Sequence, residues 1–122
     1  MSKKEKYDLV ERTAMLGETV ISFVRGIEKN EITRPLISQI VRSSASIGAN
    51  YMEADGAESK KDFRHKISIC KKEAMETRHW LRMIAAALPE RKEECRSLWR
   101  EAQELTLILA TIIKNSEKKK EE

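Results

Sequence analysis

Five basic residues fall on one face of a predicted helix in the second half of the chain. The segment 58–88 has eight Lys or Arg against four Asp or Glu, which accounts for the whole formal net charge of +4. Steps of four, seven, seven and four place five of these cations along one side of a helix. They form the basic stripe: Lys60, Arg64, Lys71, Arg78 and Arg82. Such a row is typical of surfaces that bind phosphate backbones. It is also compatible with a solvated face whose cations pair with neighbouring carboxylates.

A polar line crosses an earlier predicted helix at steps of four, four and three. It consists of Arg42, Ser46, Asn50 and Glu53. Asn50 also lies on the apolar face of that helix, and a half-buried polar group must find a partner. Glu73 and Glu76 on the next helix are the expected partners of Arg42 and Asn50. This group is either a structural network that fixes the register of the helices or a ligand or catalytic pocket.

The motif Glu76-Thr77-Arg78-His79 has the Glu-x-x-His spacing of di-iron helical bundles. Those bundles need a second such motif on another helix, whereas this sequence contains a single Glu-x-x-His motif. His65 lies about 21 Å from His79 along the same helix, at 1.5 Å per residue, so it cannot complete the site. Cys70 and Cys95 match no metal or redox spacing and are predicted to be small buried hydrophobes. We therefore expect no metal, no cofactor and no enzymatic activity.

Apolar residues at alternating steps of four and three predict the helices that position these groups. Thr33 is predicted to cap the second helix, Ser59 and Asp62 to form a capping box on the third, and Pro89 to separate the third from the fourth. Short connections favour antiparallel neighbours and hence an all-α, up-down-up-down four-helix bundle. The whole chain, 1–122, is predicted to be one domain with helices over 6–28, 34–55, 60–88 and 90–115 and a charged tail over 116–122.

The composition agrees with a helical protein that presents many solvated faces. Hydrophobic residues make up 40% of the chain, aromatic residues 5% and charged residues 36%. Sheets favour aromatic and β-branched residues, so this balance argues against them. The longest apolar stretch, 105–113, is too short to span a membrane, and the first residues have no secretory signal. A cytoplasmic protein with no membrane partner is expected.

Two predicted helices are apolar over more than one face. The residues outside the core stripes are Ile69, Trp80 and Met83 on the third helix and Trp99 and Ile108 on the fourth. A second apolar face indicates a partner surface, and these five residues are the predicted interface of a homo-oligomer. The alternative is a closely packed bundle whose helices simply use wide apolar stripes.

Three segments resemble a known family. They read RSSASIGANYMEA over 42–54, SKKDF over 59–63 and ICKKEAMETRHWL over 69–81. In these segments the chain is similar to the bacterial four-helix bundle proteins, also named 23S rRNA intervening-sequence proteins, and the likeness extends from Tyr7 to about Ile113. The resemblance implies an up-down-up-down bundle that assembles as a ring, typically a homopentamer. Accessory variability proteins of diversity-generating retroelements have a similar shape and form basic pentamers that contact nucleic acid and a reverse transcriptase. The resemblance thus implies RNA or DNA, and a reverse transcriptase or another protein, as partners.

These observations lead to three functional hypotheses. The favoured one is a non-enzymatic oligomeric scaffold that binds RNA or DNA backbones through the basic stripe, as an accessory to an RNA- or retroelement-related process. Little base preference is expected, because few aromatic side chains are free to stack on bases. The alternative is a protein-protein adaptor whose stripe meets an acidic partner. The third is an enzyme with a pocket around Glu73 and Glu76.

Overall fold

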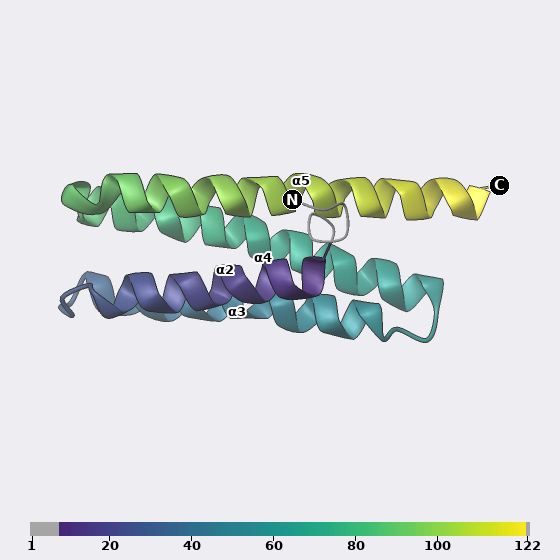
Figure 1. Ribbon diagram of the computed structural model, residues 1–122, viewed down its shortest axis with the longest axis horizontal. Coiled ribbons are helices and arrows are strands. Elements are labelled where there is room, and N and C mark those ends of the chain that lie inside the picture. Colours follow the sequence, from purple (N-terminus) through teal and green to yellow (C-terminus); the bar gives the residue numbers. More distant parts are fainter. Residues whose placement is uncertain (1–7, 122) are drawn as a thin grey trace.

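The structure consists of four long helices that lie side by side. The computed structural model describes the backbone of residues 8–121. The burial and contacts of side chains are described for residues 8–117. In chain order the elements are α2 (Leu9–Arg25), α3 (Thr33–Asp55), α4 (Lys60–Ala87), the short 3-10 helix η1 (Pro89–Arg91) and α5 (Lys92–Glu121). The connections from α2 to α3 and from α4 to α5 lie at one end of the molecule, and that from α3 to α4 at the other (Figure 1). The predicted all-α class is confirmed.

The helices pack mainly against their neighbours in the sequence. The contacts of α3 with α4 and of α4 with α5 are the most extensive, and α2 packs on α3. α2 packs much less extensively against α5 than against α3. The central position of α4 means that one of its sides faces α3 and the other faces α5.

The apolar residues at the predicted spacing form the interior. Among the side chains with no more than 1% exposure are Val20, Ile40, Ile47, Leu81 and Leu105. Burying a large aliphatic side chain contributes about 1.5–3 kcal/mol, so this interior is the main source of stability. None of the described helices combines the length and hydrophobicity needed to cross a membrane.

The ends of the first and last helices differ from the prediction. Residues 6 and 7 of the predicted helix 6–28 lie outside the described residues, and α2 ends at Arg25 rather than at residue 28. At its start, the Asp8 carboxylate accepts a hydrogen bond from the amide of Glu11 at 3.2 Å. The last helix does not end at residue 115 but continues to Glu121. Lys and Glu have high helix propensity, so a charged composition does not by itself end a helix.

The predicted cap of the second helix was also wrong. The side-chain oxygen of Asn30, not that of Thr33, accepts from the amides of Ile32 and Thr33 at 2.9 and 3.0 Å. The Thr33 hydroxyl instead donates to the carbonyl of Glu28 at 2.6 Å and closes the turn before the helix. On α4 the predicted cap is present, because Ser59 accepts from the amide of Asp62 at 3.0 Å.

Gly48 lies where α3 packs closely against α2. A Cβ atom added to Gly48 would meet the Thr13 hydroxyl at 3.5 Å and the backbone of Ala14 at 3.6 Å, which are ordinary contact distances. We therefore expect Gly48→Ala to raise the free energy of unfolding by up to about 1 kcal/mol, because Gly is the poorer helix former. Urea denaturation measures this change.

A larger side chain provides the control for Gly48. Gly48→Leu is expected to destabilise the protein by about 1–3 kcal/mol, because the extra atoms would push α2 away from α3. A loss of stability in Gly48→Ala would contradict the contact distances given above.

Candidate nucleic-acid interface and the neighbouring polar network

All five residues of the basic stripe lie on α4. Lys60 and Arg82 are exposed, while Arg64, Lys71 and Arg78 are half-buried. Within residues 8–117, the ion pairs involve Arg12, Arg42, Lys66, Arg91 and Arg96, and none involves the stripe. The carboxylates of the described chain therefore leave the stripe unneutralised, and its charge is available to an anionic partner.

Arg78 differs from the rest of the stripe because it turns towards α5. Its guanidinium donates a hydrogen bond to the side-chain oxygen of Gln103 and lies 5.7 Å from the centre of the Trp99 ring. The Nε atom of Arg78 and one terminal nitrogen of Arg64 are buried without a hydrogen-bond partner in the described structure. The stripe thus has its freest cations at Lys60 and Arg82, with Arg78 partly engaged by the chain itself.

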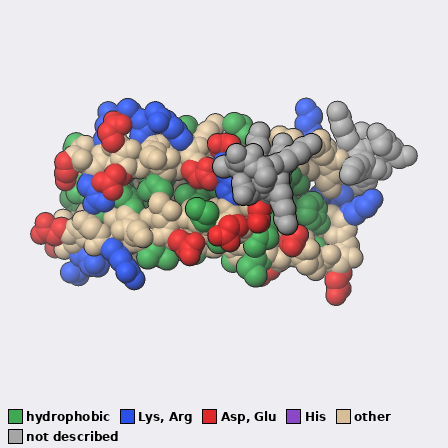
Figure 2. Space-filling model, viewed as in Figure 1, with side chains coloured by type: hydrophobic (Ala, Val, Ile, Leu, Met, Phe, Trp, Pro, Cys, Tyr) green, Lys and Arg blue, Asp and Glu red, His purple; other side chains and the backbone are tan. Residues whose placement is uncertain are grey.

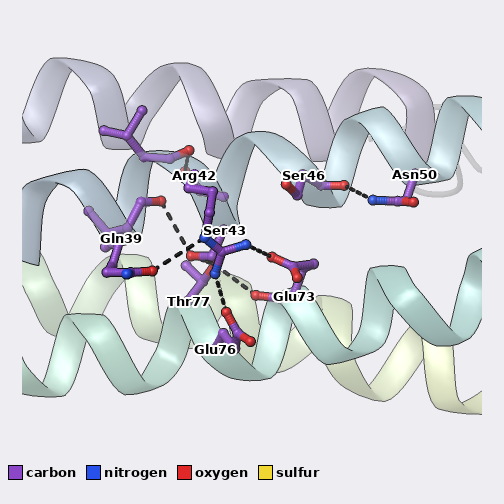
Figure 3. A network of polar contacts seen from close by, with 11 residues as sticks. Gln39, Arg42, Ser43, Ser46, Asn50, Glu73, Glu76 and Thr77 are labelled. Atoms are coloured by element: carbon purple, nitrogen blue, oxygen red, sulfur yellow. Dashed lines mark hydrogen bonds and ion pairs between the residues drawn. The ribbon is translucent and has the colours of Figure 1, made fainter.

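A polar network joins α3 to α4 on another side of the bundle (Figure 3). One terminal nitrogen of Arg42 donates to Glu73 at 3.0 Å, and the other donates to Glu76. The Nε of Arg42 donates to Gln39 at 3.3 Å. Hydrogen bonding to Glu76, followed by the attraction of Glu73, raises the pKa of Arg42, which stays charged. Since Glu73 is buried, Arg42 supplies the charge that balances its carboxylate.

The remaining residues of the polar line do not join this network. The side-chain amide of Asn50 donates to the backbone carbonyl of Ser46 at 2.9 Å, instead of reaching Glu73 or Glu76. A carbonyl one turn back on the same helix is within easy reach of a short polar side chain, so the amide is satisfied locally. Glu53 pairs with Lys66 at 2.8 Å in a largely exposed position. The expected pairing of Asn50 was therefore wrong.

Sequence analysis missed a pair of hydroxyl groups beneath the Arg42 network. The hydroxyls of Ser43 on α3 and Thr77 on α4 are fully buried and lie 2.8 Å apart. Thr77 also lies within hydrogen-bond distance of the carbonyl of Glu73 at 2.9 Å and Ser43 of the carbonyl of Ile40 at 3.4 Å, so either hydroxyl can be the donor between the two. One feature of the sequence could have revealed this pair: Ser43 and Thr77 both occupy positions on the apolar faces of their predicted helices.

A double-mutant cycle tests the Ser43–Thr77 contact. We expect Ser43→Ala and Thr77→Val each to lower the free energy of unfolding by about 0.5–1.5 kcal/mol, because each removes one buried hydrogen bond while the remaining hydroxyl keeps a backbone carbonyl as its partner. The double variant is expected to lose less than the sum of the single losses, by about 0.5–3 kcal/mol. Strict additivity in urea denaturation would show that the two hydroxyls do not interact.

The cysteines of the described structure are buried and protonated, and no metal-binding group of side chains is found there. Cys70 and Cys95 are free and buried, as predicted. Burial raises the pKa of Cys70 to about 12 and also raises that of Cys95, so both thiols stay protonated at neutral pH. In the part of the chain that the structure describes, no three His, Cys, Asp or Glu side chains are grouped so as to hold a metal ion.

The five residues of the predicted oligomer interface are only partly available to another copy. Trp80 and Ile108 pack against the main core of their own chain. Ile69 and Met83 are half-buried, and Trp99 is 38% exposed. The more exposed apolar side chains of α4 and α5 are Met75 and Leu107. Trp80 and Ile108 thus contribute to packing within the chain, while Trp99, Met75 and Leu107 leave apolar area at the surface.

Comparison with known proteins places the chain in a family. The model of the 23S rRNA-intervening sequence protein family matches residues 5–120, so the protein belongs to this family, as the resemblance predicted. A similar solved structure is a protein of unknown function from the S23 ribosomal protein family of Bacteroides thetaiotaomicron. It is 29% identical, the match covers 86% of this chain and 97% of that chain, and the TM-score is 0.76. No curated protein matches the sequence.

Proposed function

We propose that the protein is a non-enzymatic, oligomeric scaffold that binds RNA or DNA backbones through the basic stripe. The main support is that the segment 58–88, which carries the stripe, holds the charge excess of the chain, while no described carboxylate pairs with the stripe. Each cation placed near a phosphate releases counterions, which favours binding without regard to base sequence. The family name, which refers to 23S rRNA, supports RNA as the partner.

The proposal also includes self-association of the chain. The proposed protomers are up-down-up-down bundles, and several of them form a ring, for which a pentamer is the expected form. Exposed apolar side chains such as Met75 and Leu107, at 44% and 57% exposure, supply area for contacts between copies. Neighbouring copies would repeat the basic stripe, and their combined field would attract a long polyanion more strongly than one copy does.

Light scattering followed by nucleic-acid titration tests both parts. We expect the free protein to have the mass of several chains and to bind labelled RNA at low salt, with displacement by heparin. A monomer that ignores RNA at low salt would contradict the proposal. Tighter binding to polyglutamate than to RNA would instead support the adaptor hypothesis, in which the stripe meets an acidic protein.

A further inference from the structure

A groove lies beside the basic stripe, between the C-terminal half of α4 and the N-terminal half of α5. It has a volume of about 420 Å³, which is within the usual range for ligand sites, and Leu81, Ala85 and Cys95 contribute its apolar lining. Its other lining residues are Trp99 and four cations: Arg82, Lys92, Arg96 and Arg100. No acidic residue lines it within the described chain. Lys and Arg side chains gather over this first part of α5, with a few acidic ones nearby (Figure 2).

Trp99 gives the groove an aromatic surface that is held in place. The residue is 38% exposed, and the guanidinium of Arg78 lies over its ring at 5.7 Å from the ring centre. Arg78 is in turn bonded to Gln103, one turn further along α5. The sequence led us to expect few aromatic side chains free to stack, and Trp99 is an exception.

The charge around Trp99 disfavours a contact with a second copy through this groove. A groove-to-groove contact would bring another set of cations against Arg82, Arg96 and Arg100, and the two sets would repel each other. In a ring, where different faces meet, the neighbouring copy would have to present an acidic surface to this groove. One of these cations, Arg96, is paired with Glu93 at 3.2 Å, but this ion pair is exposed and therefore weak. An anionic ligand complements the groove better than another copy of the chain does.

The combination of a flat ring with several cations selects among anionic ligands. Phosphate groups match the cations, and guanidinium groups bind phosphate oxygens with two hydrogen bonds. A base stacks on an exposed indole ring only if it is unpaired, because a duplex keeps its bases inside. The ligand class that uses both features is an unpaired nucleotide within a strand.

We propose that this groove holds an unpaired nucleotide of RNA or single-stranded DNA, with its base on Trp99 and its phosphates near Arg82, Arg96 and Arg100. This inference rests on the proposed function and adds to it a preference for single-stranded over double-stranded nucleic acid. Arg82 belongs to both the stripe and the groove, so a strand following the stripe reaches Trp99 without leaving the basic surface. Trp99 is thereby assigned to nucleic acid rather than to the oligomer interface.

Fluorescence of Trp99 tests the proposal. The chain has two Trp residues, so Trp80→Phe makes Trp99 the sole indole; the RNA affinity of this background is measured first. The probes are oligouridine, oligothymidine and an RNA hairpin with the same number of phosphates and a minimal loop. We expect both single strands to quench Trp99 strongly and the hairpin to bind with little quenching. A difference between oligouridine and oligothymidine measures the preference for RNA or DNA.

Variants of Trp99 separate stacking from charge. Trp99→Leu is expected to weaken single-strand binding by about 5- to 150-fold, the effect of losing one stacked base, with hairpin affinity kept. Trp99→Phe retains an aromatic ring and is expected to recover much of the loss. Circular dichroism checks that each variant has the helix content of the parent protein.

Several outcomes would overturn the inference. If Trp99→Leu weakens hairpin and single-strand binding equally, or if single strands bind without quenching, the inference fails and the proposed function stands. If the parent protein binds neither probe, both fail. Shielding of Trp99 from acrylamide in the free oligomer would place it between copies. Stronger quenching by polyglutamate than by oligouridine would assign the groove to an acidic protein.

Discussion

Replacing Lys60, Lys71 and Arg82 together by Gln is expected to remove most of the affinity for nucleic acid. These residues include both exposed cations of the stripe, and the triple variant leaves the half-buried Arg64 and Arg78 in place. Each lost phosphate contact reduces the slope of log affinity against log salt concentration by about 0.7 for a single strand, so three contacts reduce it by about 2. Fluorescence anisotropy at several salt concentrations measures this, and circular dichroism should show unchanged helicity because Gln is a good helix former.

A charge-matched variant provides the control. Arg25, Lys29 and Arg34 lie at the α2–α3 end of the molecule, are exposed and form no ion pair within residues 8–117. Changing all three to Gln removes the same charge from residues outside both the basic stripe and the groove, and we expect binding close to that of the parent protein. Equal losses in the two triple variants would show that binding follows net charge and not the basic stripe.

Leu16→Ala is expected to lower the free energy of unfolding by about 2–5 kcal/mol. Leu16 is 3% exposed and belongs to the main core, so truncation removes apolar contacts and leaves a cavity that the helices fill incompletely. Its neighbour Met15 is similar in size but 54% exposed, because it lies about 100° away around the helix axis. We expect Met15→Ala to change stability by no more than about 0.5 kcal/mol.

Urea denaturation of these two variants tests how α2 packs. The comparison is sharp because the residues are adjacent and the helix propensity of Ala benefits both variants equally. A loss below about 1 kcal/mol for Leu16→Ala, or a larger loss for Met15→Ala, would mean that α2 presents a different face to α3 and the other helices.

The arrangement of the core could be predicted from the sequence because burial in a helix repeats with a fixed spacing. Residues such as Ile40, Ile47 and Leu81 keep the four-three rhythm and are buried. Helix ends were less predictable, since Asn30 and Thr33 are both good caps and only the path of the turn decides between them. The charged residues after 115 extend α5 because no Gly or Pro ends it.

The candidate site was predictable only as far as it lies on one helix. The spacing of the stripe on α4 follows from the sequence, but the turning of Arg78 towards Gln103 depends on which residues of α5 lie opposite. The same holds for the contact between Ser43 and Thr77, which requires the register of α3 against α4. Asn50 shows the reverse case, in which a bond within one helix replaces an expected bond between two. The register of one helix against another and the rotamers of the side chains depend on how the helices pack, so the sequence pattern of a single helix does not reveal them.

The salt dependence of binding to a long single-stranded RNA tests the central claim most directly. In one chain the five stripe cations and the groove cations Lys92, Arg96 and Arg100 can together neutralise at most eight phosphates, which corresponds to a slope of about −5.6 for log affinity against log salt concentration. If copies associate and align their stripes, a strand of about 40 nucleotides should give a slope clearly steeper than this. A slope near zero would contradict nucleic-acid binding through the stripe, and a slope shallower than about −5.6 would contradict its multiplication by self-association.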